Sequence, residues 1–202
     1  MRRNLFRMTM AAALVFPAGL MLAHPHSRAA AAPAQATPKN EAPKPAQGPS
    51  AEALAMWNAI GQKLMAMAQD FPEDKYDFRP KPEVRTFAEQ LLHVAGTNYV
   101  LLSAVKGSQM GPGTEDPDRK IYKSKADVVN LLKKSLEDGA AMIQATGDAG
   151  MSKPVKYPYG NRMVSANFIF AETAEHSGEH YGQLVVYYRL NGIVPPASRP
   201  QK

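Results

Sequence analysis

The chain has 202 residues and no cysteine, which excludes disulfides, thiolate nucleophiles and metal sites built on sulfur ligands. Its formal net charge is +6, but four of its 24 basic residues lie among the first 32, where no acidic residue occurs. The remaining chain carries 20 basic and 18 acidic residues, so a nucleic-acid partner is not expected. This length predicts one domain, with or without a tail.

Residues 1–32 have the layout of a signal peptide. Arg2, Arg3 and Arg7 precede a mostly apolar run over residues 8–23, and small residues follow it. The run is too short and too interrupted to predict a membrane span, and none is expected after removal of the signal. We therefore expect an exported protein, periplasmic or secreted. The paired arginines resemble a twin-arginine signal, but an ordinary secretory signal explains them equally well, so both routes stay open.

Residues 33–50 are predicted to form a disordered linker. They are rich in proline and alanine and lack large apolar side chains, so they have little to bury in a core. His24 and His26 lie upstream of this linker and are given no role. The folded domain is then expected to span residues 51–198.

Four amphipathic segments predict four helices, because apolar residues recur in each at steps of three and four. Their expected bounds are about 50–70, 86–105, 124–147 or 124–150, and 165–190. Thr86 with Glu89, and Ser124 with Asp127, have the spacing of capping boxes, in which each side chain satisfies a free amide of the first turn. Four helices of this length predict an all-α fold, a four-helix bundle.

Two features between and within these helices add detail. The Gly/Pro-rich loop over residues 107–118 is longer than most helix connections, long enough to cover part of the bundle. Gly96, Gly178 and Gly182 lie inside predicted helices, where glycine costs roughly 1 kcal/mol against alanine. We expect these glycines to let two helices approach closely. A strand or hairpin over residues 153–160 has only a weak signal.

Histidines supply the strongest chemical pattern. His176 and His180 stand four apart in the last helix, where positions i and i+4 share one face and two imidazoles can hold one metal ion. His93, in the second helix, is the only other histidine of the expected domain. Three imidazoles with an open fourth position are typical of a catalytic zinc-type site. A pair on a solvated face, with His93 elsewhere, is the competing interpretation.

Carboxylates beside the histidines have less certain roles. Glu172 lies one turn before His176 and could be a fourth ligand, an outer partner of a ligand, a general base or simply a solvated acid. Glu175 and Glu179 point away from the histidine face and are expected to be exposed. Gln183 and Tyr187 continue the histidine face, either to bind substrate or to pack.

Three motifs in this order resemble the DinB/YfiT-like superfamily: residues 71–80, residues 86–95, and residues 176–184 leading into 189–196. The resemblance covers most of residues 51–198. It implies a four-helix bundle that binds a divalent metal through one histidine of the second helix and a His-x-x-x-His pair of the last. The matching positions here are His93, His176 and His180. Relatives include enzymes that use small thiols, and dimers are common, so a homodimer is open.

The leading interpretation is therefore a divalent-metal-dependent enzyme. Zinc, nickel, iron or manganese would suit three imidazoles, and the metal would activate a water molecule or a substrate thiol. Both a hydrolase and a thiol-dependent transferase acting on a small molecule of unknown identity fit, although export weakens the thiol interpretation. The alternatives are a helical module that binds a metal or ligand without turnover, and a structural bundle with no role for its histidines.

Overall fold

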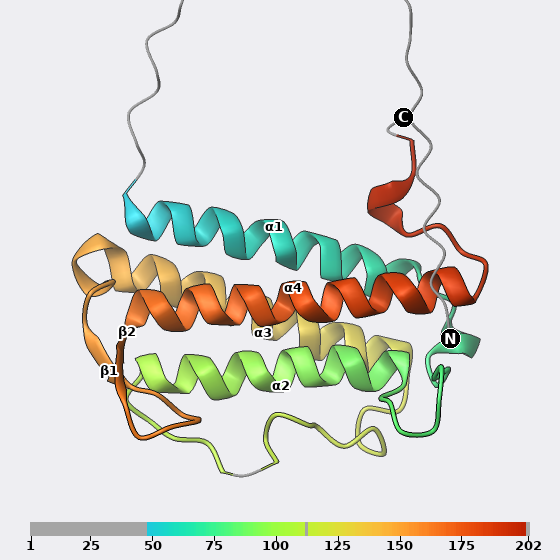
Figure 1. The fold of residues 1–202 in the computed structure, drawn as a ribbon, viewed down its shortest axis with the longest axis horizontal. Helices are drawn as coiled ribbons and strands as arrows, with labels where there is room; N and C mark the ends of the chain where they lie inside the picture. The colour runs from blue at the N-terminus through green and yellow to red at the C-terminus, as the bar shows by residue number, and fades with distance from the viewer. Residues whose placement is uncertain (1–47, 112, 201–202) are drawn as a thin grey trace, which may run out of the picture. The chain divides into compact units, whose positions relative to one another are not determined.

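The computed structural model describes residues 48–111 and 113–200, and this part of the chain contains four long helices (Figure 1). The helices are α1 (Pro49–Asp70), α2 (Phe87–Val105), α3 (Lys125–Gly150) and α4 (Ala166–Leu190). Short elements connect them or end the chain: the 3-10 helices η1 (Glu73–Lys75) and η2 (Pro196–Ser198), and the antiparallel strands β1 (Pro154–Lys156) and β2 (Met163–Ser165). The all-α four-helix bundle is confirmed, and the weakly indicated hairpin is present.

The expected signal peptide, most of the expected linker, and His24 and His26 lie outside the described residues. Pro49 and Ser50, at the end of the expected linker, already form the first turn of α1. Among the described residues, no helix combines the length and the apolar character that crossing a bilayer requires.

Local sequence signals fix the starts of the second and third helices. The Thr86 side chain accepts from the Glu89 amide, and the Glu89 carboxylate accepts from the Thr86 amide, which completes a capping box. Ser124 and Asp127 form the same reciprocal pair at the start of α3. Both caps are confirmed as predicted, because capping depends only on residues three apart.

The order of the helices around the bundle does not follow the sequence. α1 packs against α3 and α4, and α2 packs against the same two helices, so consecutive helices lie mainly on the diagonals. α2 and α3 are neighbours that run in the same direction (Figure 1). The described residues of the connection between them, 106–111 and 113–124, therefore return along α2 before α3 begins.

This returning connection explains why Gly96 is a glycine. Gly178 and Gly182 do not have the expected role of bringing two helices together. A Cβ on Gly96 would lie 2.6 Å from the carbonyl oxygens of both Thr114 and Glu115, so glycine is needed where the loop crosses α2. A Cβ on Gly178 or Gly182 would meet nothing within 4 Å. The expectation that all three glycines bring two helices together was therefore wrong, because Gly96 faces a loop and the other two face open space.

The C-terminal segment is tied back to the end of α1. The Asp70 carboxylate accepts from both terminal nitrogens of Arg199, at 2.8 and 2.5 Å, and from the Tyr188 hydroxyl at 3.3 Å. The Arg199 hydrogen bonds hold the pKa of Asp70 below its usual value, and partial burial opposes this shift. The pair is about a third exposed, so its contribution is small, below about 1 kcal/mol.

Asp70→Asn is therefore expected to lower the free energy of unfolding by up to about 1 kcal/mol at pH 7. A depressed native pKa stabilises the fold above the unfolded-state pKa of about 3.9, and this contribution is lost as the pH falls through the native pKa. Urea unfolding between pH 3 and 7 should show the difference from the wild type shrinking toward the acid end. Asp74→Asn, which removes an acid without an ion pair to another described residue, is the control. If the difference in unfolding free energy between the wild type and Asp70→Asn were the same at pH 3 as at pH 7, the ion pair could not be its cause.

Gly96→Ala is expected to destabilise the protein by about 1–3 kcal/mol, since the new methyl group would overlap the loop backbone. Helix propensity alone predicts the opposite, a gain of about 1 kcal/mol. Gly182→Ala, in open space on α4, is the matched control and should be neutral or stabilising. Chemical denaturation measures both, and equal behaviour of the two variants would show that the loop does not constrain α2.

Candidate metal centre

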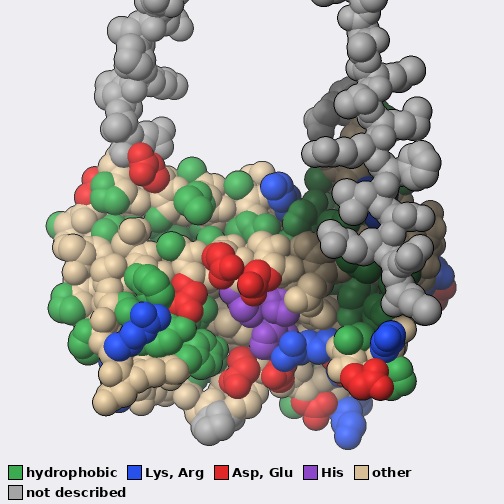
Figure 2. Space-filling model, viewed as in Figure 1, with side chains coloured by type: hydrophobic (Ala, Val, Ile, Leu, Met, Phe, Trp, Pro, Cys, Tyr) green, Lys and Arg blue, Asp and Glu red, His purple; other side chains and the backbone are tan. Residues whose placement is uncertain are grey.

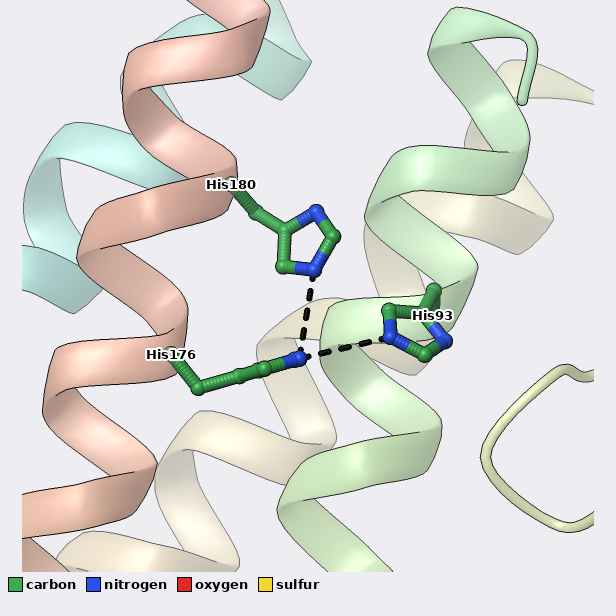
Figure 3. A group of neighbouring side chains, drawn as sticks. All are labelled: His93, His176 and His180. Atoms are coloured by element: carbon green, nitrogen blue, oxygen red, sulfur yellow. Dashed lines mark hydrogen bonds between the residues drawn. The ribbon is translucent and has the colours of Figure 1, made fainter. Parts of the chain in front are cut away.

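The structure brings the three predicted histidines together at the contact between α2 and α4 (Figure 3). The Nε2 atom of His176 lies 3.3 Å from Nε2 of His93 and 3.2 Å from Nε2 of His180. One ligand atom of each ring lies within 4.8 Å of the other two. His180 is buried, whereas His93 and His176 are partly exposed. The i,i+4 spacing on α4 and the packing of α2 against that face account for the cluster.

A chain of hydrogen bonds orients the ring of His180. The Tyr187 hydroxyl donates to the carbonyl oxygen of Arg85 and accepts from Nε2 of Gln90 at 3.4 Å. The amide oxygen of Gln90 therefore faces Nδ1 of His180, at 2.5 Å. An amide oxygen can only accept, so Nδ1 of His180 carries the proton and its Nε2 presents a lone pair to the cluster.

A carboxylate orients the ring of His93 in the same sense. Nδ1 of His93 lies 2.9 Å from the Asp116 carboxylate, which is delivered by the returning loop and also pairs with Arg85 at 2.9 Å. Because an ionised carboxylate accepts only, Nδ1 of His93 is the donor and Nε2 carries the lone pair. Thr97 approaches the same Nε2 at 3.5 Å.

Two lone pairs thus point at the Nε2 atom of His176. A single proton on that nitrogen can satisfy only one of them, whereas a cation among the three nitrogens satisfies all. Two nitrogens that share a tetrahedral zinc ion at about 2.05 Å are about 3.3–3.4 Å apart, close to the observed separations. The donor set, its outer partners and its spacing fit a divalent metal.

Burial keeps these rings in the neutral form that binds metals. Burial first, and neighbouring positive charge after it, lower the pKa of His176 to about 4 and the pKa of His180 to about 3. The pKa of His93 is also lowered, by burial first and then by Arg85, against the opposing effect of Asp116. Neutral imidazole at pH 7 needs no proton release to act as a ligand.

A cavity of about 490 Å³ is lined by His93 and His176, whereas the buried His180 does not line it. Figure 2 shows the histidine side chains reaching the surface between groups of acidic side chains, with basic side chains on one flank. The carboxylates among the cavity's lining residues are Glu115, Asp116, Glu172, Glu175 and Glu179, and the basic one is Arg85. A mostly acidic mouth raises the local concentration of cations, whether metal ions or substrates.

A larger cavity of about 820 Å³ adjoins this one, because Arg85 and Asp116 line both. It lies between the segment that precedes α2 and the returning loop, and it carries charges of both signs. Arg79 there pairs with Glu89 at 3.2 Å, and Arg119 pairs with Asp77 at 2.9 Å. The two cavities together leave ample room for a small molecule beside the histidines.

The remaining sequence expectations fare differently. Glu172 lies in the cavity wall but outside the converging ligand group, which contains the three histidines alone among the described residues. Glu175 and Glu179 are exposed, as expected. Gln183 is exposed and does not line the cavity. Tyr187 is buried and donates to a backbone carbonyl oxygen, so packing, not substrate binding, is the role observed for Tyr187.

Sequence reasoning missed three residues that hold the site. Gln90, three residues before His93, is a buried amide on an apolar face, and that exception to the pattern could have flagged it. Asp116 and Arg85 lie in connecting segments without periodicity, so only the folded structure shows that they meet His93.

The family assignment agrees with this geometry. Residues 56–184 match the model of the DinB superfamily, and the chain belongs to that superfamily. No match was found among the curated proteins.

Solved structures share the fold. A DinB-like protein from Bacillus cereus is 17% identical with a TM-score of 0.60, covering 71% of this chain and 93% of that chain. A DinB-like protein from Bacillus subtilis is 16% identical with a TM-score of 0.57, covering 74% and 99%. YfiT from Bacillus subtilis, described as a probable metal-dependent hydrolase with an unusual four-helix bundle topology, is 10% identical with a TM-score of 0.54, covering 76% and 94%. At these identities the likeness shows the fold alone.

Tyr187→Phe tests the hydrogen-bond chain behind His180. Loss of the hydroxyl leaves the Arg85 carbonyl and the Gln90 amide without this partner, at a cost of about 1–3 kcal/mol of unfolding free energy. Tyr181→Phe is the control, because its hydroxyl makes no hydrogen bond within the described residues, and a change below about 0.5 kcal/mol is expected there. Denaturant unfolding measures the free energy of unfolding of both variants. Equal values for Tyr187→Phe and Tyr181→Phe would contradict a stabilising role for the hydrogen bonds of Tyr187.

Proposed function

We propose that this protein is a divalent-metal-dependent hydrolase whose metal ligands are His93, His176 and His180. The observation that carries the proposal is the convergence of three Nε2 atoms, two of them held as lone-pair donors by Asp116 and Gln90. Membership of the DinB superfamily supports it, as does the description of YfiT, a structural relative, as a probable metal-dependent hydrolase.

Each neighbouring group has a defined task in this scheme. When bound, the metal would supply Lewis acidity and lower the pKa of a coordinated water molecule. The three imidazoles leave one side of the site facing the cavity, where a substrate has access. Arg85 lines the cavity and donates to Asp116, so it is placed to fix the carboxylate and to meet a polar group of a substrate. Burial of His180 behind the cluster excludes water from the inner side.

Thiol transfer is the other reaction that such a centre supports, and a metal-binding module without turnover is the non-catalytic alternative. The chain contains no cysteine, so a reacting thiol would have to come from a small molecule. Hydrolysis and thiol transfer would use the same metal ligands and differ only in whether the metal activates a water molecule or a thiol. Substrates therefore separate them.

The purified full chain is expected to bind one zinc ion per molecule, measured by mass spectrometry after dialysis and by titration. His176→Ala removes one ligand of three and should weaken zinc binding by roughly 100-fold or more. His93→Ala should behave alike because its nitrogen joins the same cluster. Gln183→Ala, an exposed neighbour on α4 outside the cavity, is the control and should bind as the wild type does.

Turnover of the metal-loaded protein is then measured on panels of esters, amides and thiol–electrophile pairs. Hydrolysis that is lost in His176→Ala supports the proposal. Reaction only with a thiol present would assign the transferase activity, and binding without turnover would assign the binding module. A wild type without affinity for zinc, nickel, iron or manganese would overturn both the enzymatic and the metal-binding proposals.

A further inference from the structure

Three buried side-chain atoms of the described residues lack a hydrogen-bond partner: Oδ1 of Asn98, Oε2 of Glu172 and Nδ1 of His176. Two of the three belong to residues four apart on α4, where side chains at i and i+4 are neighbours on one face. One of these two atoms is a carboxylate oxygen, and the other is a ring nitrogen that donates when protonated. The pair is a matched acceptor and donor, one turn apart.

The other two histidines of the cluster already have such a partner. Nδ1 of His93 faces Asp116 at 2.9 Å, and Nδ1 of His180 faces the oxygen of Gln90 at 2.5 Å. Histidines that ligate metals almost always donate their second N–H to a carboxylate, a carbonyl or water, which fixes the ring and raises its basicity as a ligand. His176 is thus the one ligand whose outer contact is not made directly.

Glu172 is held in place for that contact. Its Oε1 accepts from the Tyr157 hydroxyl, which projects from the segment following β1. Its Oε2 is buried, and Glu172 forms no ion pair with another described residue. Glu172 is therefore anchored through one oxygen, and its other oxygen is a buried acceptor without a hydrogen-bond partner among the described residues.

Nδ1 of His176 and Oε2 of Glu172 form no direct hydrogen bond with each other, and the tautomer of His176 decides whether Nδ1 can donate at all. A proton on Nε2 serves one of the lone pairs that face it and leaves Nδ1 as an acceptor, which cannot donate to a carboxylate. If Nε2 instead gives its lone pair to a cation, the proton resides on Nδ1. Nδ1 then becomes the donor that Oε2 lacks.

We infer that Glu172 is a positioning residue of the centre: its carboxylate accepts a hydrogen bond from Nδ1 of His176, directly or through one water molecule, and fixes that ring as a ligand. The inference rests on the proposed metal site. The Tyr157 hydroxyl donates to Oε1 of the same carboxylate. Metal binding and the tautomer of His176 are therefore coupled through Glu172.

Zinc titration of the full chain tests this role. Glu172→Ala should weaken zinc binding about 10–100-fold, the range typical for loss of an outer partner of a ligand. Glu172→Gln keeps an accepting oxygen and should recover part of the loss. Glu175→Ala removes an equal charge from the exposed mouth of the same cavity, three residues away on α4, and is the matched control that should change affinity only slightly.

Thermal unfolding without and with zinc separates positioning from a general structural role. Without zinc, Glu172→Ala should melt close to the wild-type temperature, because removing a buried oxygen that has no partner offsets the loss of the hydrogen bond from Tyr157. With zinc, it should melt below the wild type. A residue that merely supports Tyr157 would lower both melting temperatures. In the zinc-loaded wild type, nitrogen NMR should place the His176 proton on Nδ1, and exchange of this proton should accelerate in Glu172→Ala.

Two results would overturn the inference while leaving the proposed function intact. One is wild-type zinc affinity in Glu172→Ala. The other is an equal loss in Glu175→Ala, which would reduce the effect of Glu172 to the charge of the cavity mouth. A wild type that binds no zinc would instead overturn the proposed function, and this inference with it.

Discussion

The site depends on one physical constraint: Nε2 atoms of histidines on two helices, α2 and α4, converge, and two of them direct lone pairs at the third. Gln90 and Asp116 each accept a hydrogen bond from the outer nitrogen of a histidine, and this directs the inner nitrogens of His180 and His93 toward Nε2 of His176. A single proton on Nε2 of His176 satisfies only one of the two lone pairs that face it, and the Thr97 hydroxyl reaches Nε2 of His93 only at 3.5 Å. Burying these nitrogens is therefore unfavourable without a cation and favourable with one. The buried polar groups of α2 and α4 can be explained together as parts of one cation site.

The topology of the bundle brings these hydrogen-bond partners to the histidines. Because α2 and α3 are parallel neighbours, the chain must return along α2, and the returning loop carries Asp116 to His93. Gly96 permits the close crossing, since any side chain there would overlap the backbone at Thr114 and Glu115. Loop, helix glycine and ligand orientation are thus consequences of one connection.

What the sequence predicts well is what short spacing decides. The helices, the two capping boxes and the three histidines follow from periods of three and four residues and from the scarcity of histidine. The helix order and the partners Asp116 and Arg85 depend on segments that meet only in the folded bundle, so no local pattern reveals them. Gly178 shows the converse error, because a glycine in a helix suggests close packing and this one faces open space.

Charge balance explains why the acids of this site lie behind and around the imidazoles instead of among them. Three neutral imidazoles leave a divalent ion its full charge, which keeps it a strong Lewis acid, whereas a carboxylate ligand would neutralise part of that charge. Asp116 compensates from behind His93, and exposed Glu175 and Glu179 compensate from the mouth of the cavity. In this arrangement Glu172 gains its importance from position rather than from charge. It stands one turn from His176, the one proposed ligand without a direct outer partner among the described residues, so in the proposed centre it would orient that ring without binding the metal itself.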